Sequence, residues 1–267
     1  MTISLDRYFE RIGYKGNPAP NLDTLRALHF AHSTTIPFEN VDVLLGRRIR
    51  IDPASLQAKL IDARRGGYCF EQNGLFSRVL EELGFTVTRL SGRVRVGTQR
   101  ILPRTHMVLL VEADGARWLC DAGFGGWGLF EPLLLETDRE TSQYGWTFSL
   151  RREDAYWVLQ CAQCLMGGPD QYAFTLEPHL PVDYEPANHY SSTHPDSRFV
   201  QTLTAQLPTP EARYFLRNRE LVTVTQTAEV AQGLPDDAAL LEVLEKRFGI
   251  VLPKETAFGE LPRTPAA

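Results

Sequence analysis

Residues 64–76 read Arg-Arg-Gly-Gly-Tyr-Cys-Phe-Glu-Gln-Asn-Gly-Leu-Phe, a glycine turn that places a cysteine at the predicted start of a helix. Apolar residues at helical spacing from Leu75 to Leu83 share one face, and Gly84 is a typical C-terminal stop. Cys69 therefore falls at or just before the first helical turn, where unpaired N–H groups and the helix dipole favour a thiolate. The stretch predicts a cysteine nucleophile. A small buried hydrophobic residue, as most free cysteines are, is the alternative that this stretch alone leaves open.

A nucleophilic cysteine needs a base, and His106 is the histidine to which the sequence gives a carboxylate partner. Strand-like segments flank Asp114-Gly115, which is a typical hairpin turn. A two-residue or four-residue loop there sets Asp121 opposite Val108, on the same face as His106 and one diagonal step away. A three-residue loop would put the two side chains on opposite faces. Such an acid would orient and stabilise the imidazole, although a cross-strand polar pair without chemistry is the alternative.

Three further motifs contain residue types that could do chemistry. The glycine-rich run at 122–128 can approach a ligand closely, but it lacks the ending of a Walker loop and is more often a flexible turn. Cys161 and Cys164 have zinc-like spacing without a second ligand pair nearby, which favours a structural role. His29 and His32 lie three residues apart on a predicted helix, and without a carboxylate or cysteine partner a structural role is favoured there too. We expect no metal.

The elements that must position these residues change character near residue 84. Before it, caps and apolar stripes predict helices at 4–12, at 21–32, from Asp52-Pro53 onward and at the cysteine, with 36–40 as a loop or short strand. From Phe85 the hydrophobic period becomes two, which predicts strands at 85–90, 93–96, 105–111, 117–121, 146–150 and 156–159. These strands indicate an antiparallel sheet that curls toward a barrel. We expect 165–198 to be irregular, followed by strands at 199–206 and 221–226 and a helix at 235–248.

Composition excludes several classes of function. The chain has 267 residues, ordinary apolar and charged content and a net charge of −5, which argues against nucleic acid or an anionic membrane as the main partner. Four cysteines are too few for a disulfide scaffold in a chain of this length. The first residues do not form a signal peptide, and no apolar run approaches the length of a transmembrane helix. We therefore expect a cytoplasmic protein in a reducing compartment.

The run at 65–76 is similar to the active-site cysteine motif of the arylamine N-acetyltransferases, and the length fits the prokaryotic members. Four other stretches resemble motifs of the same family, in the family's order: Ile36-Pro37-Phe38-Glu39-Asn40, Thr105-His106-Met107, Asp121-Ala122-Gly123-Phe124-Gly125 and Ser192-Thr193-His194-Pro195-Asp196-Ser197-Arg198-Phe199. The region after about residue 200 matches more loosely.

The resemblance implies an α+β fold in three parts. These are a helical domain at 1–84 with the nucleophilic cysteine, an antiparallel β-barrel at 85–190 with the histidine and the aspartate, and an α/β lid at 191–267. It also implies a Cys69–His106–Asp121 triad like that of cysteine proteases and transglutaminases. The positions that correspond to the substrate pocket or lie beside the cysteine are Phe38, Tyr68, Val94, Phe124 and Phe199. The loop that contacts coenzyme A in some members includes Gly125 and Gly126, and Glu39 with Arg65 would tie the first domain to the cysteine turn.

The implied activity is acetyl transfer from acetyl-CoA to the nitrogen of arylamines, arylhydrazines or N-arylhydroxylamines, a role in xenobiotic metabolism. Because both substrates would use one cysteine, we expect ping-pong kinetics through an acetyl-Cys69 thioester. Two alternatives stay open: an amide synthase of the same family that forms a macrolactam, and a thiol hydrolase in which water replaces the amine. A binding module without chemistry is a third interpretation. A homodimer also stays open, since the sequence does not fix the oligomeric state.

Overall fold

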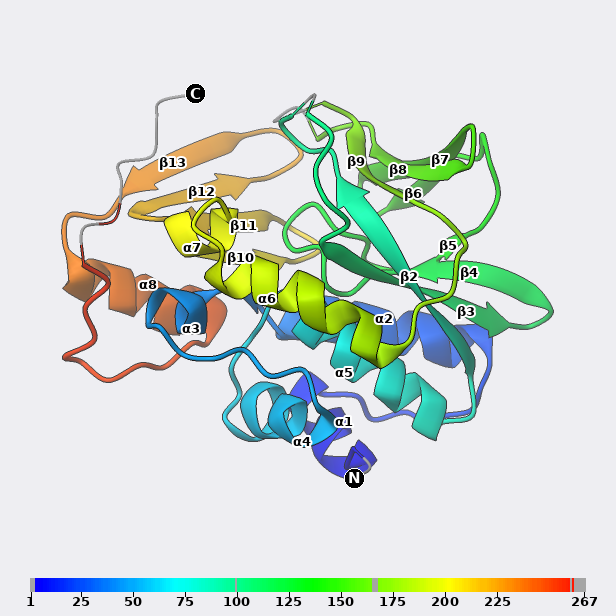
Figure 1. The fold of residues 1–267 in the computed structure, drawn as a ribbon, viewed down its shortest axis with the longest axis horizontal. Helices are drawn as coiled ribbons and strands as arrows, with labels where there is room; N and C mark the ends of the chain where they lie inside the picture. The colour runs from blue at the N-terminus through cyan, green and yellow to red at the C-terminus, as the bar shows by residue number, and fades with distance from the viewer. Residues whose placement is uncertain (1–2, 99, 165–167, 260, 262–267) are drawn as a thin grey trace.

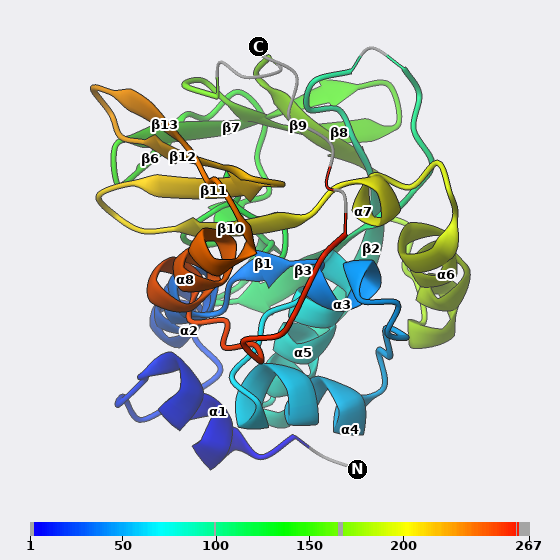
Figure 2. The ribbon, with the colours of Figure 1, turned by 90° about the vertical axis from the view of Figure 1, so that its left-hand side faces the viewer.

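The computed structural model describes residues 3–98, 100–164, 168–259 and 261. Helices from the first third of the chain lie at the bottom of Figure 1, an eight-stranded sheet lies at the upper right, and a five-stranded sheet lies at the upper left. Figure 2 shows the same three parts from the side, with the five-stranded sheet toward the left. This is the α+β architecture expected from the sequence: N-terminal helices, a nearly closed antiparallel barrel and a C-terminal α/β part.

Four helices of the N-terminal part begin within about one residue of the starts predicted from the sequence. Its elements are α1 (Leu5–Ile12), α2 (Leu22–Thr35), β1 (Phe38–Glu39), α3 (Val41–Leu44), α4 (Pro53–Leu56), the π-helical turn η1 (Gln57–Asp62) and α5 (Cys69–Glu82). The Asn21 side chain accepts the N–H of Thr24 at 2.9 Å, and Asp52 accepts the N–H of Ser55 at 3.0 Å. These bonds satisfy donors that the first helical turn leaves without partners, so both helix starts are fixed locally.

The eight-stranded sheet has the order β5-β4-β3-β2-β9-β8-β7-β6. Its strands are β2 (Thr86–Val94), β3 (His106–Ala113), β4 (Ala116–Cys120), β5 (Leu133–Leu134), β6 (Thr141–Gln143), β7 (Trp146–Glu153), β8 (Tyr156–Cys161) and β9 (Asp170–Phe174). The β3–β4 hairpin turns at Asp114 and Gly115, both with positive φ, and Leu109 pairs with Cys120. This register is the one that a two-residue loop predicts. The two strands expected at 85–90 and 93–96 are one continuous strand, β2.

The C-terminal sheet has the order β1-β10-β11-β12-β13, so it takes its first strand from the N-terminal part. The other strands are β10 (Thr204–Pro208), β11 (Arg213–Arg217), β12 (Glu220–Val224) and β13 (Glu229–Gly233), and α8 (Asp237–Phe248) packs beside β10. Within β1, Phe38 pairs with Gln206 on one side and bridges to Gly67 on the other. One short strand therefore joins the C-terminal sheet to the turn that precedes the cysteine.

The prediction of irregular structure at 165–198 is wrong for much of that stretch. Within it the structure has β9, the 3-10 helix η2 (Pro181–Tyr184) and α6 (Glu185–Thr193). Helix α6 is rich in Ser, Thr, Asn and His, which have weak intrinsic helix propensity, so its sequence gave little local signal. The strand expected at 199–206 begins later, because residues 198–201 form the short helix α7 (Arg198–Gln201). Residues 165–167 lie outside the described residues.

Cys161 and Cys164 form a disulfide at the end of β8, with their Cα atoms 5.4 Å apart. Both side chains are buried, and Cys161 belongs to the apolar cluster inside the barrel. Each sulfur is bonded to the other, which fits the structural role favoured for this pair rather than a zinc site. Cys69 and Cys120 are free cysteines.

Gly66 gives a test of how closely the chain packs before the cysteine. A Cβ atom there would lie 2.0 Å from the backbone oxygen of Pro37, a fixed group next to β1. At Gly74, inside α5, a Cβ would meet only the flexible end of Leu56 at 3.3 Å. We expect Gly66→Ala to lower the free energy of unfolding by about 2 kcal/mol or more. The control Gly74→Ala should stay within about 1 kcal/mol of the wild type, since alanine favours the helix. Urea denaturation measures both; equal stabilities would contradict the packing.

Candidate active site

Helix α5 places Cys69 at its first helical position. The carboxylate of Glu71 accepts the N–H of Tyr68 at 3.1 Å, which fixes the entry of the chain into the helix. Helical geometry leaves the N–H groups of the first turn without partners inside the helix, so the cysteine sits at a positively polarised end. The Cys69 thiol donates to the carbonyl of Thr105 at 3.5 Å, and the residue is only 3% exposed. The cysteine is therefore a buried thiol at a helix start, with its proton directed at a backbone carbonyl.

His106 and Asp121 form the pair that the hairpin register predicts. His106 Nε2 lies 2.7 Å from Asp121 Oδ2 in a setting where both residues are at most 2% exposed. The other carboxylate oxygen accepts from the Asn73 side chain at 2.8 Å and from the N–H of Gly123 at 3.0 Å. Both oxygens of the buried carboxylate are therefore satisfied, and His106 Nδ1 is left for the cysteine side of the ring.

Charge sets the protonation of this pair. Burial alone would lower the pKa of His106, but Asp121, and then the hydrogen-bonded Cys69, raise it well above its ordinary value. Burial alone would raise the pKa of Asp121, but the His106 imidazolium, the Asn73 amide and the Gly123 N–H hold it below its usual range. The arrangement therefore stabilises a charged imidazolium next to the sulfur, which is the proton state that a thiolate nucleophile needs.

Asn73 is a residue of the site whose role the sequence reasoning did not assign. Its amide donates to the Met107 carbonyl at 2.7 Å and to Asp121, while its side-chain oxygen accepts the N–H of Ala122 at 3.1 Å. It follows Cys69 by four residues, so both lie on the same face of α5. That spacing is the signal that could have identified it. Asn73 connects the cysteine helix directly to the acid.

His29 and His32 are structural, as expected. His29 Nε2 accepts the backbone N–H of Asp121 at 2.9 Å, and its Nδ1 lies 2.9 Å from the Phe130 carbonyl. His32 lies 2.8 Å from both the Gln72 side-chain oxygen and the Tyr8 hydroxyl. Burial lowers the pKa of His29 to about 4 and that of His32 to about 3. Both rings are therefore neutral at pH 7, and His29 holds the backbone of the acid.

The residues expected to line the substrate pocket fall into two groups. Phe38, Tyr68 and Phe199 form one aromatic cluster, in which the Phe199 ring lies 5.8 Å from Phe38 and 5.3 Å from Tyr68. The hydroxyl of Tyr68 donates to the Asn188 side chain, so its polar end faces α6. Phe124 belongs to the second group.

In that second group, the Phe124 ring lies 5.1 Å from the His106 ring and 5.0 Å from the Tyr172 ring. Val94 pairs with Tyr172 in the register of β2 and β9. Tyr172, which the sequence reasoning did not name, lies 4.7 Å from His106 and joins Phe124 and Val94 to the imidazole. Aromatic and apolar groups therefore surround the candidate base, and their role toward a substrate stays a prediction.

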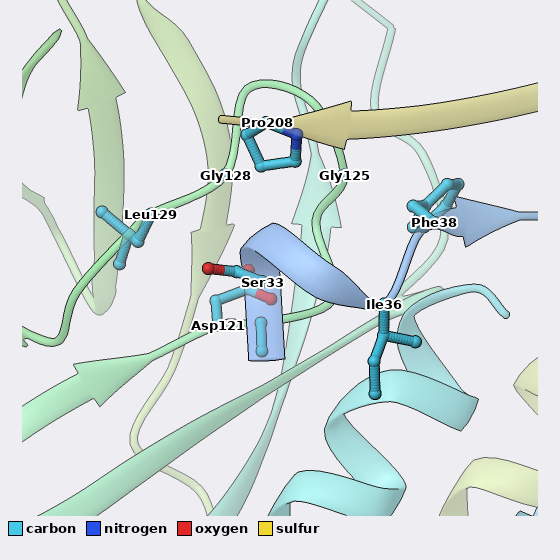
Figure 3. Close-up of a pocket in the computed structure, with 9 residues that line it drawn as sticks. Ser33, Ile36, Phe38, Asp121, Gly125, Gly128, Leu129 and Pro208 are labelled. Carbon is cyan, nitrogen blue, oxygen red and sulfur yellow. The ribbon is translucent and has the colours of Figure 1, made fainter. Parts of the chain in front are cut away.

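The glycine loop follows Asp121 and borders a small cavity. Figure 3 shows the residues that line it: Asp121 and Ser33 lie near the centre, Gly125 and Gly128 lie on the loop, and Phe38 lies on the Gly125 side. The cavity measures about 10 Å³, which is room for about one water molecule and no organic substrate. Gly125 has φ +89°, a conformation that favours glycine.

The Glu39–Arg65 pair expected from the sequence is present and belongs to a larger buried network. Arg65 Nη2 lies 2.7 Å from the Glu39 carboxylate, and Lys59 lies 2.7 Å from Glu71 and 3.0 Å from Asp42. Burial raises the pKa of Glu71 to about 7 despite the neighbouring Lys59. The network ties β1 and η1 to the cysteine turn.

We searched the described part of the chain for clusters of side chains that could bind a metal ion. No group of three or more His, Cys, Asp or Glu side chains there is arranged to hold a metal ion. Among the same residues, none of the helices is long and apolar enough to span a bilayer.

Comparison with known proteins finds relatives that are all described as N-acetyltransferases. A family model described as N-acetyltransferase matches residues 21–257. The arylamine N-acetyltransferase of Escherichia coli (strain K12) is 43% identical over 94% of this chain and 90% of its own length. That of Mycolicibacterium smegmatis is also 43% identical, over 94% of both chains.

Solved structures agree in fold as well. The arylamine N-acetyltransferase of M. tuberculosis superposes with a TM-score of 0.89 at 40% identity, covering 92% of this chain and 94% of that one. The Mycobacterium marinum arylamine N-acetyltransferase in complex with CoA has a TM-score of 0.87 at 37% identity, with 92% and 93% covered. The similarity extends over nearly the whole chain and includes all three parts of the fold.

Replacing the acid tests the electrostatics of the pair. In Asp121→Asn the carboxylate that raises the pKa of His106 is gone, so burial should leave the imidazole neutral, as it leaves His29. We expect the rate of Cys69 alkylation by iodoacetamide at pH 6 to fall at least about tenfold, the factor for one pKa unit. Asp114→Asn, at the tip of the same hairpin, is the control and should react like the wild type. Equal rates in all three proteins would contradict a charged His106.

The lowered pKa of His29 predicts how the free energy of unfolding changes with pH. The folded pKa of His29 lies below the ordinary value of 6.5, so the unfolded chain binds more protons and stability is lost as the pH falls from about 6.5 toward 4. His29→Gln keeps an acceptor for the Asp121 N–H but does not titrate. The loss of unfolding free energy between pH 7 and pH 5 should therefore be smaller in this variant by about 2 kcal/mol. Urea titrations at both pH values measure it. The exposed His189→Gln is the control, and an unchanged pH dependence in His29→Gln would exclude the assignment.

Proposed function

This chain belongs to the arylamine N-acetyltransferase family of acyltransferases, and we propose that it moves an acetyl group from acetyl-CoA to the nitrogen of arylamines, arylhydrazines or N-arylhydroxylamines through an acetyl thioester on Cys69. The observation that carries the mechanism is the hydrogen-bonded His106–Asp121 pair beside a cysteine at a helix N-terminus. The complex of the M. marinum relative with CoA supports the donor.

In the first half-reaction, His106 holds the proton of the Cys69 thiol and the thiolate attacks the thioester carbonyl. The new carbon–sulfur bond forms as the carbonyl becomes an oxyanion, which N–H groups at the start of α5 would stabilise. The bond to the coenzyme A sulfur then breaks, and that thiolate takes the proton from His106. Asp121, held by Asn73 and Gly123, keeps the imidazole oriented throughout.

In the second half-reaction, the amine nitrogen attacks the acetyl-Cys69 carbonyl and His106 accepts its proton. The carbon–sulfur bond breaks, the amide leaves and the resting thiolate–imidazolium pair is restored. The nucleophile must therefore arrive with a free lone pair. An alkylamine such as lysine, with a pKa of about 10.4, is protonated near neutrality, whereas arylamines and hydrazines are largely neutral there. The chemistry of the site therefore favours aromatic amines as acceptors.

Aromatic side chains near the cysteine support the same acceptor class. We assign Phe38, Tyr68, Val94, Phe124 and Phe199 to the acceptor side, because aromatic rings stack against apolar and aromatic neighbours. Gly125 and Gly126 belong to the donor side in this proposal. We also propose three domains, at 1–84, 85–190 and 191–267. The proposal further includes a cytoplasmic location, a role in xenobiotic metabolism, and either a monomer or a homodimer.

A thiol hydrolase would use the same three groups and differ in its acceptor, which would be water. Cys69, His106 and Asp121 are each at most 3% exposed, and this burial applies to water and to an amine alike. An amide synthase of the same family, acting on a tethered acyl chain, uses the same groups and differs in its substrates, so only the acceptor distinguishes it.

The intact mass of the protein after brief mixing with acetyl-CoA tests the mechanism. We expect a gain of one acetyl group that an aromatic amine such as 4-aminosalicylate removes, because the amine is the second substrate of the same cysteine. Cys69→Ala is the control and should gain nothing. Release of coenzyme A that continues without amine would favour the hydrolase. No adduct on folded protein with a free thiol would overturn acetyl-CoA as the donor.

A further inference from the structure

Arg213, on β11, is a fully buried cation for which the mechanism above has no use. Its Nη1 donates to the carbonyls of Gly126 and Gly128, the latter at 3.1 Å. Its Nε and Nη2 are buried without a hydrogen-bond partner, and within the described residues no carboxylate forms an ion pair with it. A buried charge of this kind is costly, so its retention needs an explanation.

Aromatic faces take the place of a counter-ion. The guanidinium carbon lies between 4.5 and 5.8 Å from four ring centroids, those of Trp127, Phe130, Trp146 and Phe148. Cation–π attraction to desolvated rings offsets part of the cost of burial. Burial lowers the pKa of Arg213 to about 9, so the side chain stays protonated near neutrality. Within the described residues no ion pair balances this charge.

Two residues of the C-terminal sheet, Gln206 and Arg213, hydrogen-bond to the glycine loop. Gly128 donates its N–H to the Gly125 carbonyl at 2.8 Å, which closes the turn, and Gly126 donates to the Gln206 side chain at 2.8 Å. A Cβ on Gly126 would lie 2.2 Å from the Phe215 ring, so the loop also packs directly on β11. Gln206 and Arg213 thus bind the N–H and the carbonyl of the same residue.

The carbonyl orientation has an electrostatic consequence. A trans peptide points its N–H opposite to its carbonyl, so the carbonyl of Gly126, turned toward Arg213, directs the N–H of Trp127 the other way. The carbonyl oxygens of Gly126 and Gly128 therefore face the Arg213 guanidinium, and the N–H of Trp127 faces away from it. In a low-dielectric interior such a charge acts over several ångströms. The same loop follows Asp121 and carries Phe124 against His106.

We propose that Arg213 is a positioning residue for the acyl donor, which fixes the 125–128 loop and gives it the positive potential that the phosphates of coenzyme A require. This inference rests on the proposed function, since it needs the donor to approach that loop. It names a residue of the C-terminal sheet as a determinant of donor selectivity, acting through the loop and without contact to the reacting atoms.

A donor without phosphates separates this role from simple support of the fold. Acetylpantetheine has the same thioester as acetyl-CoA but lacks the phosphates, so the rate constant of Cys69 acetylation by each donor is measured from intact mass. We expect Arg213→Met to lose about tenfold with acetyl-CoA and less than about twofold with acetylpantetheine. Gln206→Glu keeps the acceptor for Gly126 but adds a negative charge, and it should change in the same direction even if Arg213→Met folds poorly.

Arg247→Met is the matched control. Arg247 is an exposed arginine of α8, and its guanidinium lies 4.2 Å from the centre of the Tyr214 ring on β11. The substitution therefore removes a cation–π contact with the same sheet but leaves the glycine loop unchanged. We expect both of its rates to equal those of the wild type. Equal losses with both donors in the Arg213 and Gln206 variants, or no loss in either, would overturn the inference. Wild-type protein that neither donor acetylates would instead overturn the proposed function itself.

Discussion

Three consecutive buried polar side chains on α5, those of Glu71, Gln72 and Asn73, are the constraint on which the site depends. Each must be hydrogen-bonded, because an unsatisfied buried polar group costs about 1–3 kcal/mol. Glu71 bonds to the cysteine turn and to Lys59, Gln72 to His32 and the chain before β1, and Asn73 to the acid loop. The helix cannot rotate or slide without breaking several of these bonds at once. Cys69 lies within about one turn of all three side chains, so the position of its sulfur depends on bonds to the cysteine turn, to α2 and to the acid loop.

Strand β1 connects the turn before Cys69 to the C-terminal sheet. Two residues, Phe38 and Glu39, pair with β10 on one edge, and Glu39 donates its N–H to the Gly67 carbonyl at 3.1 Å on the other. The Glu39 side chain is fully buried and is neutralised by Arg65, so the strand is held by charge as well as by backbone pairing. The C-terminal sheet thus touches the site twice, through β1 near the cysteine and through the glycine loop near the acid.

Local patterns predicted the parts of this arrangement that are local in origin. The start of the Cys69 helix, the helix start near Asn21, the cap at Asp52 and the hairpin register that pairs His106 with Asp121 follow from residues close in sequence. The polar helix α6 was missed, because its residues favour helix only weakly and it is stabilised by tertiary packing. The aromatic rings around Arg213 come from the stretch at 127–130 and from β7, both more than 60 residues before Arg213, so no short window of the sequence contains them together with the arginine.

The buried histidines show why the family resemblance and the physical chemistry agree on a base. His29, His32 and His106 are all almost completely buried, and burial alone lowers the pKa of each. The partners of His29 are a backbone carbonyl and a backbone N–H, which one neutral tautomer satisfies completely. The partner of His106 is a carboxylate, which has no proton to give and therefore favours the imidazolium. Equal burial with different partners makes two rings inert and one able to hold a proton, and that one lies beside the free cysteine at the helix start.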